Sequence, residues 1–558
     1  MRKLGGLNYI SRLKEALPVS LAFCLSFILI GCMAFVAENP GGLPFKLSDI
    51  APTLLLVTAA CFALLLFLIP LFRGKIYKAL VLIVSSALFA GYIQGSFLNM
   101  GLGELTGDMI NWDSYIPSIV GSSIFWLAVF AAFFLLAHYK ETSWRVLTLF
   151  LPVILVAMQT AGLASTLYDY NKAEASSSIN DEEMLTIDGL HNPASEKNAI
   201  IFVLDRLDEE FVIQIEKNNP GFFDVLDGFT KFDDNISYNG STFPSVAGML
   251  TGNRYMYDRT RVDYLDYAWA NAEMMNEMKA RGVDIRLFME RGYAYSSSEN
   301  LKGIAGNIGR GHFDISERIA LIKLLKLSGF RYAPTPLKQA FWISPTEFGD
   351  TLTFTDSNAF YFVNDFAFYE NIREFGLSPS EAEMGFFYYH LQGAHGPLNM
   401  DENIEWVEEE ITNDYTAARV RQATGCFKII FEYLDQLKAL GLYEDATIII
   451  TGDHPDFRGN ELENPALTAL FVKPAGSYGT PLAYSHAPVC PDQLPGTVME
   501  GLFGDRGGYA PGYMDVEEGA EAVRVYDINL YSYEILGDGR DIGNWTFSGL
   551  HPDTWWKK

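Results

Sequence analysis

Five long apolar runs in the first third of the chain constrain its fold more than any other feature. They cover residues 18–37, 51–72, 77–98, 115–139 and 144–166. Each has about the 20 residues that an α-helix needs to cross the hydrocarbon core of a bilayer. A single cleavable signal peptide does not account for five such runs, and a buried helix of a soluble protein is seldom so free of charge. We therefore predict a five-span transmembrane domain over residues 1–167.

Basic residues in the short loops predict the orientation of these spans. Arginines and lysines precede the first run and follow the second and fourth, whereas Lys46 is the only basic residue in the other two loops. Because cytoplasmic loops are enriched in Lys and Arg, we expect a cytoplasmic N-terminus. Five crossings then place the chain after residue 167 on the extracytoplasmic side of the cell membrane.

Charge and cysteine content describe the remaining two thirds of the chain. The formal net charge of −27 falls mostly there, and such acidity argues against nucleic acid as a partner. Three of the five cysteines lie in the apolar runs, which excludes a disulfide framework. Cys426 and Cys490 lie outside them; the sequence favours two unpaired thiols and leaves one bridge open.

A second domain is predicted to begin at Asn198. Residues 168–197 are polar and lack an apolar period, which indicates a linker. The runs AIIFVLD and ATIIITGDH are typical of buried parallel strands, and helix-like segments lie between them. We predict an α/β domain with a mostly parallel central sheet over residues 198–535, and a tail packed on it over 536–558.

One segment of this domain, DISERIALIKLLKLSGFRY from Asp314, is amphipathic and basic. Its composition fits a helix that rests on the membrane surface. A core helix with solvated lysines fits equally well, so both interpretations stay open.

The segment TFPSVAGMLTG, residues 242–252, sets a hydroxyl at the start of a predicted helix. Pro244 suits the first turn, where its missing N–H costs nothing. The first amides of a helix lack internal partners and favour an anion such as phosphate. Thr242 is therefore placed as a nucleophile for a phosphoryl group, although the segment alone fits an ordinary helix cap as well.

Further reactive side chains follow the predicted strands, where functional groups of parallel sheets collect. Asp205, Asp453 and His454, with the Thr242 oxygen, make a hard O/N ligand set for one divalent cation such as Mn, Mg or Zn. Coordination and the helix terminus both favour the alkoxide form of the threonine.

Three other histidines are candidate substrate-binding residues. His395, in HLQGAHGP, and His486, in YSHAPVC, are predicted to surround the phosphate and to act as catalytic residues. There they would stabilise charge on its oxygens or protonate a leaving alkoxide; holding a second metal ion is the alternative. His390 is either a third substrate-binding residue or a histidine satisfied by the core.

These motifs resemble a known superfamily. TFPSVAGMLTG is similar to the sulfatase signature, in which Cys or Ser is followed by any residue, Pro-Ser-Arg, four residues and Thr-Gly. With AIIFVLD before it and TGDH after it, residues 198–500 resemble the alkaline phosphatase and sulfatase superfamily, which implies an α/β/α sandwich. The predicted spans narrow the resemblance to the lipoteichoic acid synthases and lipid A phosphoethanolamine transferases. HLQGAHGP is close to the H-x-x-G-S-H-G-P pattern of the latter.

Departures from the superfamily pattern limit what the resemblance implies. Val246 replaces the sulfatase arginine, and Thr242 cannot be converted to formylglycine, which argues against a sulfatase. Asp205 stands where both membrane families usually have Glu, and PDFRGNELENP replaces the Glu-Ser-x-Gly-Glu run of the transferases. The donor specificity of either family is therefore not carried over.

The compartment and the resemblance together imply a reaction. No ATP pool exists outside the membrane, so the expected donor is an outer-leaflet phospholipid such as phosphatidylglycerol or phosphatidylethanolamine. Attack by Thr242 gives a phosphothreonine, and a glycan or envelope polymer is the expected acceptor. The alternatives are a phosphodiesterase or phosphatase that uses water, a non-catalytic lipid-binding protein, and a transporter, which the scarcity of ionisable residues in the spans argues against.

Overall fold

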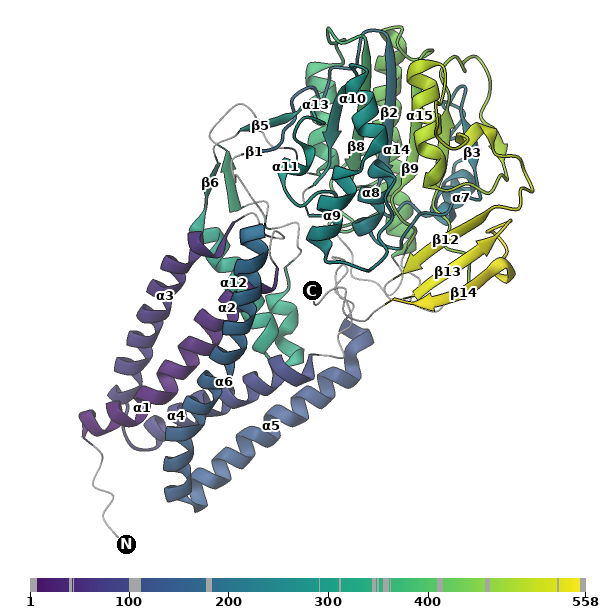
Figure 1. The fold of residues 1–558 in the computed structure, drawn as a ribbon. Coiled ribbons are helices and arrows are strands. Elements are labelled where there is room, and N and C mark those ends of the chain that lie inside the picture. The colour runs from purple at the N-terminus through teal and green to yellow at the C-terminus, as the bar shows by residue number, and fades with distance from the viewer. Residues whose placement is uncertain are drawn as a thin grey trace. The chain divides into compact units, whose positions relative to one another are not determined.

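The computed structural model forms two compact units, made of residues 1–176 with 313–353 and of residues 177–312 with 354–558. Figure 1 shows the elements of each, with the first five spans in purple and blue. The structure describes residues 8–39, 43, 45–99, 112–176, 183–290, 292–310, 313–343, 348, 351–354, 361, 363–408, 415–456, 462–528 and 531–551.

Among its described residues, the first unit contains five helices that are long and apolar enough to cross a membrane. They are Tyr9–Glu38, Leu47–Leu71, Gly74–Leu98, Trp112–Tyr139 and Glu141–Asn171, which confirms the five predicted spans. Their elements are α1 (Tyr9–Cys24), η1 (Leu25–Ile30), α2 (Gly31–Glu38), α3 (Leu47–Leu68), η2 (Ile69–Leu71), α4 (Gly74–Ile93), η3 (Gln94–Leu98), η5 (Trp112–Tyr115), α5 (Ile116–Tyr139) and α6 (Glu141–Ser176). Apolar length is a local property of the sequence, so the spans were readable without knowledge of their packing.

A sixth helix, α12 (Glu317–Tyr332), packs against these spans. Ala320 and Leu324 are fully buried in a cluster with residues of α2 and α3. A Cβ atom on Gly31 or Gly95 would lie 2.8 or 2.7 Å from the ring of Tyr332, so the glycines permit the close approach of α12. The short elements β6 (Phe313–Ile315), η6 (Thr335–Phe341) and β7 (Leu352–Phe354) flank it.

The burial of α12 agrees with the interpretation of its sequence as a core helix, although one of its lysines, Lys323, is buried as well; contact with the membrane surface stays a prediction. Residues of α12 belong to the hydrophobic core of the first unit. The sequence prediction instead included this segment in the α/β domain, residues 198–535. An amphipathic period shows that one face is buried but carries no information about which partner covers it.

In the part of the second unit that the structure describes, seven strands form one sheet with the order β11-β3-β10-β9-β2-β8-β4. Its strands are β2 (Lys197–Leu204), β3 (Thr230–Phe232), β4 (Asp284–Phe288), β8 (Met384–Leu391), β9 (Thr447–Gly452), β10 (Leu470–Lys473) and β11 (Ala483–Ser485). Of these strands, β10 alone runs antiparallel to its neighbours. The mostly parallel sheet predicted from the sequence is confirmed.

Helices cover both faces of this sheet because β2 is apolar on both sides. Ile200 and Phe202 enter one core with α7, α13 and α14, while Ile201 and Val203 enter another with α8, α10 and α15. The layers are visible in Figure 1. The helices are α7 (Glu209–Asn218), α8 (Thr242–Thr251), α9 (Arg261–Ala270), α10 (Glu273–Ala280), α11 (Ser298–Leu301), α13 (Asp365–Phe375), α14 (Thr416–Ala439) and α15 (Leu494–Phe503).

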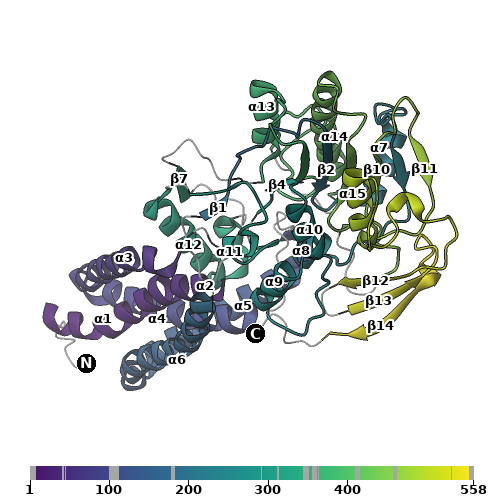
Figure 2. The same cartoon turned by 45° about the horizontal axis from the view of Figure 1, so that its top comes forward.

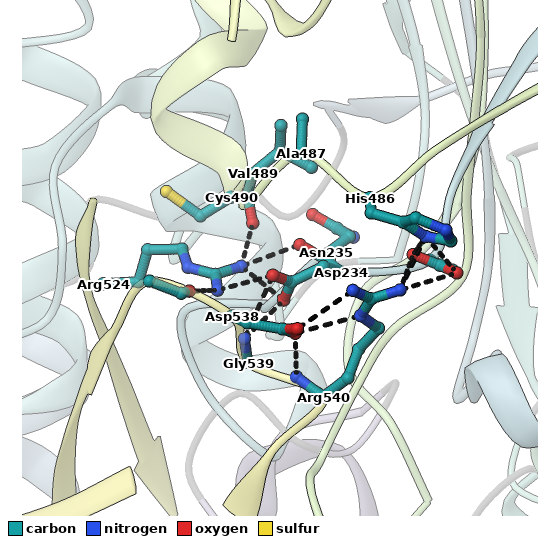
Figure 3. Close-up of polar contacts among 12 residues, drawn as sticks. Asp234, Asn235, His486, Ala487, Val489, Cys490, Arg524, Asp538, Gly539 and Arg540 are labelled. Carbon is teal, nitrogen blue, oxygen red and sulfur yellow. Dashed lines mark hydrogen bonds and ion pairs between the residues drawn. The ribbon is translucent and has the colours of Figure 1, made fainter. Parts of the chain in front are cut away.

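A three-stranded antiparallel sheet ends the described chain, drawn in yellow in Figure 2. It comprises β12 (Val523–Ile528), β13 (Tyr531–Leu536) and β14 (Trp545–Leu550), so residues on both sides of the predicted boundary at 535 share one sheet. A separate pair joins β1 (Glu183–Leu185) to β5 (Ile308–Arg310). The buried Arg524 guanidinium holds the terminal sheet, since it lies 2.9 Å from the carboxylate of Asp234 and donates to Val489 O at 3.1 Å (Figure 3).

Candidate functional site

The ends of three neighbouring strands bring the predicted ligands together. In the register of the sheet, Leu204 of β2 pairs with Leu391 of β8 and with Gly452 of β9. Asp205 and Asp453 follow Leu204 and Gly452 directly. Because parallel strands end at the same edge of a sheet, both carboxylates lie at that edge.

Asp205, Asp453 and His454 form a compact cluster in which each residue offers one ligand atom, and these atoms lie within 4.8 Å of one another. His454 Nε2 lies 3.5 Å from Asp205 Oδ1 and 3.7 Å from Asp453 Oδ2. Ligands held about 2.1 Å from one tetrahedral metal ion are about 3.4 Å apart. The spacing of the three side chains therefore matches that of a shared coordination sphere.

Thr242 joins this cluster at the start of α8. Its Oγ1 lies 3.4 Å from Asp205 Oδ2 and 3.5 Å from His454 Nε2. Phe243 has extended backbone angles, so the threonine stands just before the regular part of the helix, whose first amides favour an anion. The structure thus brings together all four residues that the sequence predicted as metal ligands.

Unsatisfied oxygens show that the cluster suits a cation. Asp205 Oδ1 and Asp453 Oδ2 are buried, and neither has a hydrogen-bond partner among the described residues. The other Asp453 oxygen accepts from the backbone amides of Arg206 and His454, both at 2.9 Å. A buried polar atom without a partner costs about 1–3 kcal/mol, and more when it is charged. A divalent cation between the two carboxylates would remove that cost, so the donor set fits one.

The close approach of carboxylates and imidazoles shifts the pKa values within the cluster. Burial alone would lower the pKa of His454, but the carboxylates of Asp453 and Asp205 raise it to about 9. Burial would likewise raise the pKa of Asp205, yet the charges of His395, His454 and His390 hold it well below the usual range. His454 Nδ1 lies 2.7 Å from Pro455 O and donates to it, which leaves Nε2 directed at the cluster.

His390 and His395 come from β8 and the loop that follows it. His390 Nε2 lies 3.7 Å from Asp205 Oδ2 and has no hydrogen-bond partner among the described residues. The loop passes very close to the end of β2 at Gly393. A Cβ atom there would lie 2.6 Å from the Asp205 amide nitrogen, and φ is +60°, so both the space and the backbone angle require a glycine. Ala394 N also donates to Asp205 O at 2.9 Å. The loop that carries His395 is therefore fastened to the first predicted ligand.

Helix α14 holds the same loop from the other side. The Gln422 amide donates to His395 O at 2.8 Å and to Gly393 O at 3.0 Å. Arg419 donates to Ala394 O at 2.6 Å. Both side chains are buried, so the position of His395 depends on two residues of α14 that are not part of the cluster.

His486 lies elsewhere along the sheet edge. Its Nδ1 is 2.8 Å from Asp233 Oδ2 and 2.6 Å from Arg540 Nη1, and its side chain is 52% exposed (Figure 3). It follows β11, which is four strand positions from β2, or about 19 Å at the usual strand spacing. None of its contacts among the described residues is with the cluster, and its predicted role at the phosphate stays a prediction.

Sequence reasoning missed two acidic residues beside the site. Glu290 follows β4 by two residues; burial raises its pKa, the charge of Asp205 raises it further, and His390 and His395 oppose the shift. Its place at a strand end was a usable signal. Asp365 accepts from the Gln392 and Gly393 amides, at 2.7 and 3.2 Å, and nothing in the local sequence marks that role.

Asp365, which holds this loop, also contacts one of the two cysteines whose pairing the sequence did not settle. Cys426 donates its thiol to Asp365 Oδ2 at 2.9 Å. Cys426 and Cys490 are both unpaired. The interpretation that the sequence favoured, two thiols without a bridge, agrees with the structure.

Comparisons with known proteins give distant structural likenesses. No protein-family model and no curated protein sequence matches the chain. Among solved structures, it is similar to an alkaline phosphatase superfamily protein from Vibrio parahaemolyticus (11% identity, TM-score 0.39, 68% of this chain and 90% of that one). It is also similar to a lipoteichoic acid synthase from Listeria monocytogenes (12%, 0.36, 69% and 94%) and to the lipooligosaccharide phosphoethanolamine transferase A from Neisseria meningitidis (12%, 0.31, 87% and 95%).

Proposed function

We propose that this chain is a membrane-anchored phosphotransferase of the alkaline phosphatase and sulfatase superfamily. It moves a phospholipid head-group phosphate, of the glycerophosphate or phosphoethanolamine type, onto a cell-envelope glycan or polymer. One observation carries the proposal: the Thr242 hydroxyl lies 3.4 Å from Asp205 and 3.5 Å from His454, within a cluster that also contains the buried carboxylate of Asp453. A threonine with a purely structural role does not require carboxylates and an imidazole around its hydroxyl, whereas a threonine nucleophile requires such groups, or a metal ion that they hold, to be activated.

Asp205, Thr242, Asp453 and His454 would hold one divalent ion, and His390 with His395 are the residues available to a second. When bound, the ion favours the alkoxide of the threonine and offsets charge on the phosphoryl oxygens. The oxygen-rich donor set suits Mn or Mg, and the single imidazole also permits Zn.

The chain's own residues divide the reaction into two displacements. The Thr242 oxygen forms a bond to phosphorus while the bond from phosphorus to the diacylglycerol oxygen breaks. The proton of the threonine goes to solvent, and His395 supplies a proton to the departing diacylglycerol alkoxide. The oxygen of the acceptor alcohol then bonds to the phosphorus of the phosphothreonine, its proton passes to His395, and the bond from phosphorus to the Thr242 oxygen breaks. The departing threonine oxygen takes back a proton from solvent, which restores the hydroxyl.

The five apolar helices favour a lipid donor. A soluble phosphate ester needs no membrane anchor, whereas the phosphodiester of a phospholipid stays at the bilayer surface. We propose the orientation with the N-terminus in the cytoplasm and the α/β unit outside the cell membrane, in line with the basic loops. Protease digestion of spheroplasts tests it, because the α/β unit should be cleaved without lysis.

Mass spectrometry of the full-length protein tests the reaction. The purified chain, in detergent with Mn, Mg or Zn, is incubated with phosphatidylglycerol or phosphatidylethanolamine. We expect a head-group phosphate adduct on Thr242 and release of diacylglycerol, both lost in Thr242→Ala by about 10³-fold or more. Thr251→Ala, in the same helix, is the matched control and should retain both.

The acceptor is tested in the same mixture. Transfer to an added glycan acceptor distinguishes a transferase from a phosphodiesterase, which would release the free head-group phosphate. Absence of an adduct with every metal, together with head-group release that does not depend on Thr242, would refute the proposed function.

A further inference from the structure

Three arginines lie close together in the chain after α8, and one of them differs from the others. Arg254 Nη2 lies 3.0 Å from Asp527 Oδ2, and Arg259 Nη2 lies 2.9 Å from Asp258 Oδ2. Arg261 makes no ion pair and no hydrogen bond from its side chain to any residue that the structure describes. In a chain with a net charge of −27, acidic partners are abundant, so an unpaired guanidinium requires an explanation.

The surroundings of Arg261 are aromatic. Its Cζ lies 4.6 Å from the ring centre of Phe243 and 5.5 Å from that of Tyr293. Phe243 belongs to a buried cluster with Tyr255 and Tyr264. Ring faces attract the cation by about 0.5–1 kcal/mol each at exposed sites, but they satisfy none of its five N–H donors.

The position of Arg261 in its helix adds to the cost. It is the first residue of α9, after the N-cap Thr260. Cations are unfavourable at a helix N-terminus, where the dipole is positive. Burial among the rings lowers the pKa of Arg261, and the groups that oppose this shift are tyrosines, not carboxylates. Neither local structure nor ion pairing accounts for a cation at this point.

The Arg261 guanidinium packs on the ring of the residue that follows the proposed nucleophile in the chain. Phe243, on which it rests, directly follows Thr242, so their Cα atoms are about 3.8 Å apart. Tyr293 belongs to the segment after β4. Burial and the charges of Glu290 and Asp205 raise its pKa, whereas the charge of Arg261 lowers it, so Tyr293 interacts both with the residues at the sheet edge and with Arg261. Arg261 and Tyr293 both retain exposed surface, although protein atoms crowd the Arg261 guanidinium itself.

We propose that Arg261, with the hydroxyl of Tyr293, binds an anionic phosphate ester group of the substrate beside Thr242. The assignment rests on the proposed function and names the residue that recognises the charge of the donor. Guanidinium N–H groups match the geometry of phosphate oxygens and form charge-assisted hydrogen bonds with them. Such an unpaired cation would also offset the repulsion that an acidic surface exerts on an anionic ligand.

Binding of a small phosphate ester measures this role without turnover. The probe is glycerol 3-phosphate, titrated calorimetrically into the full-length Thr242→Ala protein in detergent with manganese. Adding Arg261→Gln should weaken binding about 10-fold or more, the usual effect of losing a charge-assisted hydrogen bond. Arg261→Lys should restore part of the affinity, since it keeps the charge but not the planar donor set. Tyr293→Phe should weaken binding less than Arg261→Gln.

Arg259→Gln is the matched control, because Arg259 lies two residues away and is paired with Asp258. It should leave the affinity unchanged. Added salt should weaken binding to the Arg261 protein more than to the Arg261→Gln protein. Unchanged affinity in Arg261→Gln, equal weakening in Arg259→Gln, or no saturable binding to the Thr242→Ala protein would each overturn the proposal.

The two proposals fail in different ways. Saturable binding that depends on Arg261, without an adduct on Thr242 from any lipid, would reject the transferase and keep the anion site. An adduct on Thr242 that forms at the same rate and the same lipid concentration in Arg261→Gln would reject the anion site and keep the transferase. Thermal unfolding of each variant identifies any that has lost its fold, and Arg261→Lys provides the independent comparison if Arg261→Gln has.

Discussion

Metal binding should depend on pH through His454, and the structure sets the size of the effect. The two carboxylates at 3.5 and 3.7 Å raise the pKa of this imidazole from 6.5 to about 9 in the metal-free protein. A metal ion binds only the deprotonated Nε2, so it must displace a proton at neutral pH. The apparent association constant should rise tenfold per pH unit up to about pH 9.

The total effect is large enough to measure. The pKa of His454 rises from 6.5 to about 9, a difference of about 2.5 units. Between these two pH values the metal affinity should therefore rise roughly 300-fold, or by about 3 kcal/mol. An imidazole with its ordinary pKa would show little further rise above pH 6.5. Manganese affinity, measured by competition with a chelator at pH 6.5, 7.5 and 8.5 on the full-length protein, distinguishes these cases.

Calorimetry in two buffers with different ionisation enthalpies should count about one proton released per ion at pH 7. His454→Gln should flatten the pH dependence, whereas His551→Gln, a histidine paired with Asp527, should keep it. Affinity that stays constant from pH 7 to 8.5 would refute the reasoning. The sign for stability is opposite: because the folded pKa is raised, the contribution of His454 to the metal-free protein is full below pH 6.5 and is lost as pH rises through about 9.

Three further substitutions test the packing around the site and the spans. Arg524→Met leaves a buried carboxylate unpaired and should lower the free energy of unfolding by about 3–5 kcal/mol, with earlier proteolysis of the terminal sheet. Gln422→Leu removes the amide that donates to two loop carbonyls and leaves them only the longer contacts from Cys426 Sγ, at 3.5 Å, and Gln392 Nε2, at 3.4 Å. It should cost about 1–3 kcal/mol and reduce turnover while the metal content of the protein is unchanged. In Gly95→Leu the new side chain would clash with the Tyr332 ring, which should lower the free energy of unfolding in detergent by about 1–3 kcal/mol. Gly121→Leu, with open space around the new side chain, should leave the free energy of unfolding unchanged.

The parts of the fold that the sequence predicted are those encoded locally. The spans and the buried strands are continuous apolar runs, so their number and type follow from short windows. The cluster of Asp205, Asp453 and His454 was predictable because parallel strands end at one edge, which brings two distant segments of the chain into one site.

Features that depend on distant partners were not predictable. Gln422 positions His395 from a helix whose sequence gives no sign of that contact. That no described residue forms an ion pair with Arg261 becomes visible only when its neighbours are known. The contact of His486 with Asp233 was likewise not predicted from its motif, and its role at the phosphate stays a prediction.

The interleaving of the chain has a consequence for anyone who wishes to separate the two units. Because α12 belongs with the spans but is encoded after residue 312, no single cut yields two complete pieces. A fragment that begins at residue 183 would carry the apolar face of α12 into water, where it would promote aggregation. During synthesis, the spans likewise reach the bilayer before their sixth helix has been translated, so completion of that bundle must await residue 332.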